Sequence, residues 1–369
     1  MGDVLTYTVK QSDMKRLGQY REHLCKNPRL TYLFFELTDA CNLNCIHCGS
    51  SACPQNNTYL SAGAIKQVLD QVAAAFSPQS IMICLSGGEP LLHPHCFEII
   101  EYAKRLGFSC GITTNGTLID YAVSTKIVNS CIDSVTFSLD GLADTHDWFR
   151  NKAGSFAKTL QGIRNLLVAS QGLISTQITT VIHKKNIHQL EAIYDLACEL
   201  GVDSWRAVNL EPIGRALDHQ SLLLDPQQFR HLLRFLREKR YSPRTQIDVT
   251  YGCSHYLTEE FERTVRDHYF LCGSGILVAS ILCNGDIYSC MDIERRPELV
   301  QGNIYVDNFI DIWKNRFQIY RKDRSNDCEM CRHCHERDFC RGDAAHTWNY
   351  NENKPMLCVK QLLNKQGGA

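Results

Sequence analysis

Residues 32–48 read YLFFELTDACNLNCIHC, an apolar run followed at once by three closely spaced cysteines. The run predicts a buried strand over residues 32–38, so Cys41, Cys45 and Cys48 fall on the loop at its carboxyl end, the edge at which parallel-strand folds place their chemistry. Three thiolates would leave one iron of a four-iron cluster open, whereas four would close it. On spacing alone a zinc knuckle stays open as an alternative, with His47 as its fourth ligand or with that ligand missing.

Six units of a short apolar strand and a segment of helical periodicity run from Tyr32 to about Leu210. Such alternation is typical of a parallel sheet. The sequence therefore predicts an α/β fold. The expected strands cover residues 32–38, 81–85, 109–113, 134–139, 175–182 and 204–210, with helices such as 62–75 and 97–106 between them.

The character of the chain changes after a helix-like run over residues 226–236 and a polar stretch over 237–245. Beyond this point cysteines crowd and long periodic helices stop. We expect an N-terminal extension over residues 1–30, a core domain over 31–245 and a small cysteine-rich domain over 246–369. A small, loop-rich domain of this kind can gain folding energy from bound metal.

The charge balance and the cysteine count limit which partners and which cellular compartment we expect for the protein. The 369 residues carry 39 Lys and Arg against 40 Asp and Glu, which gives no electrostatic basis for a nucleic acid or an anionic membrane as partner. No signal peptide and no apolar run of spanning length stands out, so we expect a cytoplasmic protein. In that reducing compartment, the 19 cysteines are expected to include metal ligands rather than a disulfide framework.

The spacing C-x3-C-x2-C over Cys41, Cys45 and Cys48, with His47 before the last cysteine, resembles the signature loop of radical S-adenosylmethionine (SAM) enzymes. The resemblance implies a partial, six-unit TIM-like (β/α) barrel and a 4Fe-4S cluster on these three cysteines. It also implies that the open iron chelates SAM, whose one-electron cleavage gives methionine and a 5'-deoxyadenosyl radical that abstracts hydrogen from substrate. An electron donor such as flavodoxin or ferredoxin is then expected.

A glycine-rich turn ends the second expected strand, at Gly87, Gly88, Glu89 and Pro90. Glycines let backbone approach a ligand closely, and a carboxylate can receive an ammonium group. The turn resembles the family motif that binds the SAM amino group. Taken alone, a Gly-Gly pair is more often only a turn.

Further polar residues stand at the ends of later strands. Arg150 resembles an arginine that in the family pairs with the SAM carboxylate. The alternative interpretation is that Arg150 is a solvated charge on the surface. Asn209 and Glu211, which end the sixth strand, give a weaker signal. The positions that resemble those facing the ribose and methionine parts of SAM are Thr114, Asn115, Ser138 and Asp140.

The spacing Cys331-x2-Cys334-x5-Cys340, with Cys358 following, resembles the C-terminal extension called SPASM. The resemblance implies that these four cysteines hold an auxiliary 4Fe-4S cluster. A register starting at Cys328 would place an arginine at the third ligand position, so Cys331 is the better start. A four-cysteine zinc ribbon is the alternative.

A second auxiliary site is less complete. Cys272-x12-Gly285-x4-Cys290 fits the pattern that begins it, and Asn284-Gly285-Asp286 predicts a hairpin between them. Ala344 stands where the family usually carries another ligand. The pair is therefore either completed into a second auxiliary cluster or merely structural. The residues considered for completing it are Cys253, Cys283, Cys328 and Asp343.

Fold alone does not choose the substrate. The subgroup most often modifies a ribosomally made precursor peptide by cross-linking, epimerisation or oxidation, and we expect this function. Only about 30 residues precede the first strand, too few for the leader-binding domain of many such enzymes.

Other functions stay open at the level of the sequence. One is a small-molecule or cofactor maturase, for instance one that acts on a tetrapyrrole side chain. Sulfatase maturation is disfavoured, because Met291 stands where those relatives carry an aspartate. A non-enzymatic iron-sulfur or zinc protein would require the motifs to be coincidental. No catalytic base or radical relay is assigned.

Overall fold

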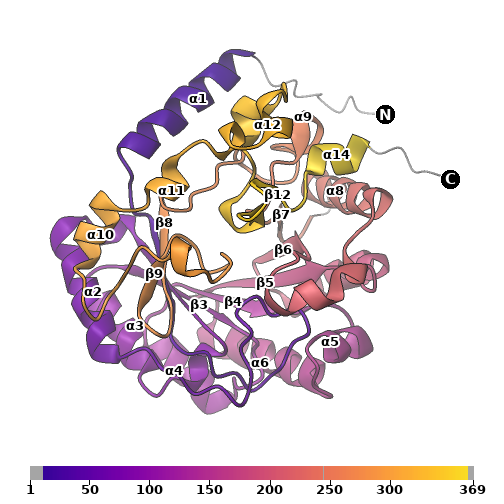
Figure 1. Ribbon diagram of the computed structural model, residues 1–369. Coiled ribbons are helices and arrows are strands. Elements are labelled where there is room, and N and C mark those ends of the chain that lie inside the picture. The colour runs from indigo at the N-terminus through magenta and orange to yellow at the C-terminus, as the bar shows by residue number, and fades with distance from the viewer. Residues whose placement is uncertain (1–10, 244, 365–369) are drawn as a thin grey trace.

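The structure is a computed structural model that describes residues 11–243 and 245–364. One curved sheet of ten strands forms its framework (Figure 1). Its order is β10-β9-β8-β1-β2-β3-β4-β5-β6-β7, and every neighbouring pair from β8 to β7 is parallel. The strands are β1 (Tyr32–Glu36), β2 (Met82–Ser86), β3 (Ser109–Thr114), β4 (Ser134–Ser138), β5 (Ser175–Ile182), β6 (Ser204–Asn209), β7 (Asp248–Tyr251), β8 (Val278–Ile281), β9 (Asp286–Tyr288) and β10 (Gly302–Asn303). A separate hairpin joins β11 (Trp348–Asn349) and β12 (Lys354–Pro355).

Helices follow most of the parallel strands and cover the outer side of the sheet (Figure 1). The α-helices are α1 (Gln11–Lys26), α2 (Ala62–Ala75), α3 (Cys96–Arg105), α4 (Tyr121–Asn129), α5 (Ala143–Phe149), α6 (Ser155–Ser170), α7 (Leu190–Leu200), α8 (Pro226–Tyr241), α9 (Thr258–Phe261), α10 (Phe309–Asn315), α11 (Gln318–Arg321), α12 (Glu329–Arg332), α13 (Arg337–Cys340) and α14 (Val359–Asn364). The 3-10 turns are η1 (Pro78–Ser80), η2 (Pro90–Leu92), η3 (Ile187–Gln189), η4 (Gly214–Leu222), η5 (Pro297–Leu299), η6 (Arg324–Asn326) and η7 (Ala345–Thr347).

The two faces of the sheet have different surroundings. Trp205 on β6 is fully buried against Tyr194 of α7 and Phe235 of α8, so alternate residues of the strands form the core beneath the helices. The residues between them, such as Arg206, face the concave side and are only partly buried. That concave side is the interior of a partial barrel.

The structure confirms the α/β class and the six expected strands, with ends that differ by one or two residues. The hairpin expected at Asn284-Gly285-Asp286 is also confirmed, since β8 and β9 pair antiparallel and Gly285 has φ of +88°. Helix α8 runs on to Tyr241, through part of the polar stretch over residues 237–245, and its start is fixed by a capping box of Asp225 and Gln228.

The sheet does not stop near residue 245, where we expected the core domain to end. Strand β7 pairs with β6, and β8 pairs with β1, so both edges of the six-strand unit are extended by segments beyond that point. The main hydrophobic core is likewise continuous from Leu30 to Leu363. The cysteine-rich segment therefore shares its core with the barrel.

The N-terminal helix α1 packs on this C-terminal segment. The buried guanidinium of Arg21 donates to the backbone carbonyls of Phe270 and Phe339, which lie just before Cys272 and Cys340. Burial lowers the pKa of Arg21 to about 10. One side chain thus holds together two segments that carry cysteines.

None of the helices that the structure describes has the length and apolar character needed to cross a membrane.

Candidate functional site

The thiols of Cys41, Cys45 and Cys48 gather on one wall of a cavity of about 180 Å³ beyond the end of β1. Arg215 from η4 fixes this loop by donating to the carbonyls of Cys45 at 2.7 Å and Ala52 at 2.9 Å. Burial raises the pKa of Cys41 to about 12. Burial raises the pKa of Cys45 as well, so these two thiols need a positively charged partner, such as iron, to ionise at neutral pH.

Gly87 and Gly88 line the same cavity, but their closest neighbour is the protein's own backbone. A Cβ atom on Gly87 would lie 2.5 Å from the carbonyl oxygen of Thr38, and one on Gly88 would lie 2.1 Å from that of Ala40. The amides of Gly88 and Glu89 donate to these same two carbonyls. The glycines thus dock the turn onto the start of the cysteine loop, the close approach for which glycine is required.

Glu89 and Pro90 are not among the residues that line the cavity. The fully buried Glu89 carboxylate accepts hydrogen bonds from Thr114 Oγ1 at 2.8 Å, Asn115 N at 2.9 Å and Leu91 N at 3.2 Å. Burial raises its pKa to about 7 against these hydrogen bonds. The carboxylate therefore joins the ends of β2 and β3, and its contact with the SAM amino group stays a prediction.

Thr114, Asn115 and Ser138 do line the cavity, as expected from their positions at strand ends. The side-chain Nδ2 atom of Asn115 lies 3.9 Å from Cys41 Sγ and donates to Asn42 Oδ1 at 2.9 Å. The polar ends of β3 and β4 thus face the cysteine loop across the cavity. Their contacts with SAM itself stay predictions.

Arg150 is 8% exposed, which rules out the solvated surface charge that the sequence left open. Its Nη2 pairs with Asp140 Oδ2 at 2.5 Å, and its Nη1 lies 3.7 Å from Cys45 Sγ. Asp140 is itself fully buried and accepts from the amide of Val181 at 2.8 Å. Burial raises the pKa of Asp140 while Arg150 opposes that rise. His47 stacks on Phe149 beside this pair, with ring centroids 3.9 Å apart.

The four C-terminal cysteines expected to act together, Cys331, Cys334, Cys340 and Cys358, line a single cavity of about 580 Å³. Lys360 Nζ lies 3.4 Å from Cys334 Sγ. Cys328 is not among the residues lining this cavity, although its side chain contacts Cys331 and packs with Trp348 behind the cavity wall. The structure therefore brings together the register that starts at Cys331.

Cys253, Cys272 and Cys290 form a second group. Their closeness is shown by the charges of Cys253 and Cys272, which both act on the Cys290 thiol. Burial raises the pKa of Cys290 well above its usual range, and the charge of Asp292 and then those of the two neighbouring thiols raise it further. Cys272 Sγ accepts from the amide of Ala345 at 3.3 Å. Of the residues considered for completing this pair, Cys253 is the one placed with it.

The other three candidates are engaged elsewhere. The amide of Cys283 donates to Glu36, Cys328 packs with Cys331 and Trp348, and Asp343 pairs with His255. Within residues 11–243 and 245–364, no three His, Cys, Asp or Glu side chains stand at the spacing that holds a single metal ion. An iron-sulfur cluster separates its ligands further, because each cysteine binds a different iron.

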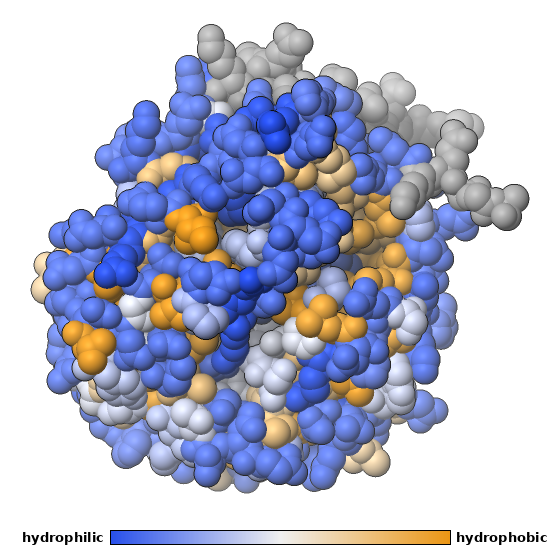
Figure 2. All heavy atoms as spheres, viewed as in Figure 1, coloured by the Kyte–Doolittle hydropathy of each residue, from blue (hydrophilic) through white to orange (hydrophobic). Residues whose placement is uncertain are grey.

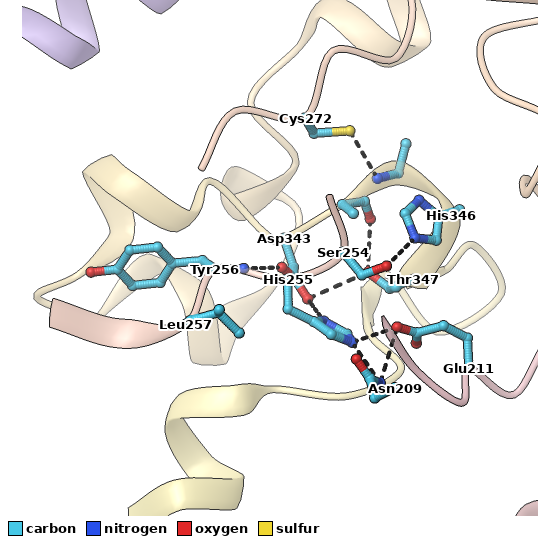
Figure 3. A network of polar contacts seen from close by, with 12 residues as sticks. Asn209, Glu211, Ser254, His255, Tyr256, Leu257, Cys272, Asp343, His346 and Thr347 are labelled. Carbon is cyan, nitrogen blue, oxygen red and sulfur yellow. Dashed lines mark hydrogen bonds and ion pairs between the residues drawn. The ribbon is translucent and has the colours of Figure 1, made fainter. Parts of the chain in front are cut away.

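A buried charge network, which the sequence did not reveal, joins the barrel to the C-terminal segment (Figure 3). His255 Nε2 lies 2.8 Å from Glu211 after β6, and His255 Nδ1 lies 2.5 Å from Asp343. Burial alone would lower the pKa of His255, but the two carboxylates raise it to about 10. Glu211 gave a weak signal at a strand end, whereas no motif marks His255.

Comparison with known proteins agrees with this geometry. The family model described as radical SAM superfamily matches residues 35–197, and the one described as iron-sulfur cluster-binding domain (SPASM) matches residues 272–335. The chain belongs to the radical SAM superfamily and carries a SPASM domain.

Two curated relatives illustrate the range of the family. The chain is 31% identical over 356 residues to the AdoMet-dependent heme synthase of Methanosarcina barkeri, covering 90% of this chain and 96% of that protein. It is 29% identical over 313 residues to the mycofactocin maturase MftC of Mycobacterium tuberculosis, covering 84% of this chain and 77% of that one. Among solved structures, SuiB of Streptococcus suis bound to S-adenosylmethionine shares the fold at a TM-score of 0.73 and 16% identity, over 96% of this chain and 84% of that one.

The protein is thus an enzyme that uses a 4Fe-4S cluster and SAM, with auxiliary iron-sulfur binding in its SPASM domain. The donor sets fit: three thiols share one cavity wall near the barrel mouth, and four thiols share the larger C-terminal cavity. When bound, the first cluster supplies the electron that cleaves SAM to the 5'-deoxyadenosyl radical. The chain's own part is to hold the thiols, dock the loop and place Arg150 beside them.

Proposed function

We propose that the protein modifies a ribosomally synthesised precursor peptide by cross-linking, epimerising or oxidising one of its residues. The observation that carries the redox part of this proposal is the pairing of an open three-thiol site with a four-thiol site in one chain. After hydrogen abstraction, a closed auxiliary cluster can accept the electron left on the substrate. The similarity to the mycofactocin maturase supports a role as a maturase.

The ligand assignments belong to this proposal. Cys41, Cys45 and Cys48 hold the SAM cluster, and Cys331, Cys334, Cys340 and Cys358 hold an auxiliary cluster. Cys253 joins Cys272 and Cys290 at a second auxiliary site. We also place the protein in the cytoplasm, with flavodoxin or ferredoxin as its electron donor.

Tetrapyrrole side-chain modification is the second candidate function. It is favoured by the heme synthase of Methanosarcina barkeri, to which the match covers 96% of that protein's length. Both candidates use the same radical and the same sites, and they differ in what occupies the barrel interior.

One experiment separates the two candidates. The anaerobically reconstituted enzyme is incubated with SAM and reductant, together with either a short peptide encoded beside its gene or an iron tetrapyrrole that carries propionates. Product is detected by mass spectrometry alongside 5'-deoxyadenosine. Conversion of the peptide supports the first function, and conversion of the tetrapyrrole alone overturns it in favour of the second.

A further inference from the structure

A row of side chains crosses the interior of the barrel from the cavity at the cysteine loop toward Cys253. Ser138 on β4 is paired in register with Thr179 on β5, and Thr179 is paired with Arg206 on β6. Residues paired across neighbouring strands project from the same face of a sheet. Because Ser138 lines that cavity, Thr179 and Arg206 face the same interior.

Neighbouring residues confirm the direction of Arg206. Trp205 packs under the helices on the outer face, and successive side chains of a strand point to opposite faces. The Arg206 charge acts on the thiols of both Cys84 on β2 and Cys253 after β7. Arg206 therefore lies in the interior between these cysteines. Figure 2 shows the molecule from the same side as Figure 1, with a hollow near the centre of this face.

Arg206 carries an unneutralised charge. Its Nε donates to Thr179 Oγ1 at 3.2 Å, and among the residues that the structure describes no carboxylate lies within ion-pair distance of it. Other arginines at this end of the barrel are engaged: Arg150 pairs with Asp140, Arg295 pairs with Glu36, and Arg215 donates to backbone carbonyls. Two terminal nitrogens of Arg206 thus remain for a ligand.

We propose that Arg206 binds a carboxylate of the substrate inside the barrel. The planar guanidinium presents paired donors that match the two oxygens of a carboxylate, and its partly buried position makes the contact stronger than it would be in open water. The location lies between the cavity at the cysteine loop and the group of Cys253, Cys272 and Cys290, where a substrate would meet both sites. This inference rests on the proposed function and adds that the substrate is held as an anion.

Cys84 offers a probe of the site that needs no substrate. Iodoacetate and iodoacetamide both alkylate a thiol with loss of iodide, but only iodoacetate carries a carboxylate. The ratio of their rates at Cys84 cancels the ionisation of the thiol itself. That ratio, measured by peptide mass spectrometry on the cluster-loaded enzyme without SAM, reports the anion affinity next to Cys84.

In Arg206→Gln, the iodoacetate-to-iodoacetamide ratio at Cys84 should fall by about three- to tenfold. Arg206→Lys keeps the charge and should retain most of the ratio. Gln177→Ala, which removes a neutral interior side chain from β5, is the matched control and should leave the ratio unchanged. An unchanged ratio in Arg206→Gln overturns the anion site.

The substrate itself gives the second measurement. Whichever compound the wild type converts is offered with its carboxylates free, or as the amide (peptide) or methyl ester (tetrapyrrole). Arg206→Gln should raise KM for the free acid by about ten- to a hundredfold and leave KM for the neutral analogue unchanged. An equal KM for the free acid in both enzymes overturns the substrate role. If the wild type converts neither compound, the proposed function fails, and the alkylation ratio still decides the anion site.

Discussion

The Nη1 atom of Arg150 lies 3.7 Å from the Sγ atom of Cys45, on the wall of the cavity at the cysteine loop. A buried cation beside a ligand sulfur stabilises the added negative charge of a reduced cluster. The same guanidinium neutralises the buried carboxylate of Asp140. One side chain thus supports both the electrostatics of the cluster loop and the packing beneath it.

Arg150→Met should shift the reduction potential of the SAM cluster to a more negative value, because the nearby cation is lost. It should also lower the free energy of unfolding by about 3–5 kcal/mol, since Asp140 is left buried and unpaired. Redox titration followed by electron paramagnetic resonance and denaturant unfolding measure the two effects. The double variant Arg150→Met with Asp140→Asn should recover the free energy of unfolding but not the reduction potential. Recovery of both would contradict a direct effect of the Arg150 charge on the cluster.

Replacing Cys41, Cys45 and Cys48 together by Ala should abolish reductive cleavage of SAM while iron at the C-terminal sites remains. The readouts are 5'-deoxyadenosine formation and iron content per chain, which should fall by about four. Undiminished 5'-deoxyadenosine formation would show that the three thiols do not hold the SAM cluster.

Cys334→Ala combined with Cys340→Ala should separate cleavage of SAM from turnover. A closed auxiliary cluster cannot chelate SAM, so the variant should still form 5'-deoxyadenosine with strong reductant yet fail to oxidise its substrate. Folding is the control, because a small domain that loses its metal can unfold. A folded variant with wild-type turnover would make the auxiliary cluster structural.

Cys253→Ala should reduce the iron bound by the reconstituted wild type from about twelve to about eight per chain, if Cys253 completes the site of Cys272 and Cys290. Cys283→Ala is the matched control, since Cys283 lies beside Glu36 rather than with that pair. A wild type that binds only about eight irons would show that the second site is empty. Zinc in place of iron at Cys331, Cys334, Cys340 and Cys358 would indicate that these four cysteines form a zinc ribbon.

His255 should make folding stability depend on alkaline pH. Its pKa is about 10 in the folded protein and about 6.5 in an unfolded chain, so its contribution is complete below about pH 6.5. That contribution is lost as pH rises toward 10. Denaturant unfolding across this range should show a smaller loss of stability in His255→Gln than in the wild type, and parallel curves would exclude a charged His255.

The cysteine loop and the six strands were predictable because each follows from local pattern: apolar runs, turn residues and fixed cysteine spacing. The attachment of β7 to β6 and of β8 to β1 was not predictable, since both added strands are four residues long and their partners are distant in sequence. No motif marks Arg206 in the sequence, and its place in the interior follows only from its register with Thr179 and Ser138. His255 could not be found from sequence because its partners Glu211 and Asp343 belong to separate segments.

The pairing of β8 with β1 has a mechanical consequence for electron transfer. Strand β1, which leads into Cys41, is hydrogen-bonded to β8, the first strand of the hairpin that leads to Cys290. The separation of the cysteine loop from the group of Cys253, Cys272 and Cys290 is therefore set by a sheet rather than by a flexible tether. Tunnelling rates fall steeply with distance, and a rigid spacing would keep the electron path constant through every catalytic cycle. A chain cut near residue 245 would lose more than its auxiliary sites, because the exposed edge of β1 would loosen the support of the cysteine loop itself.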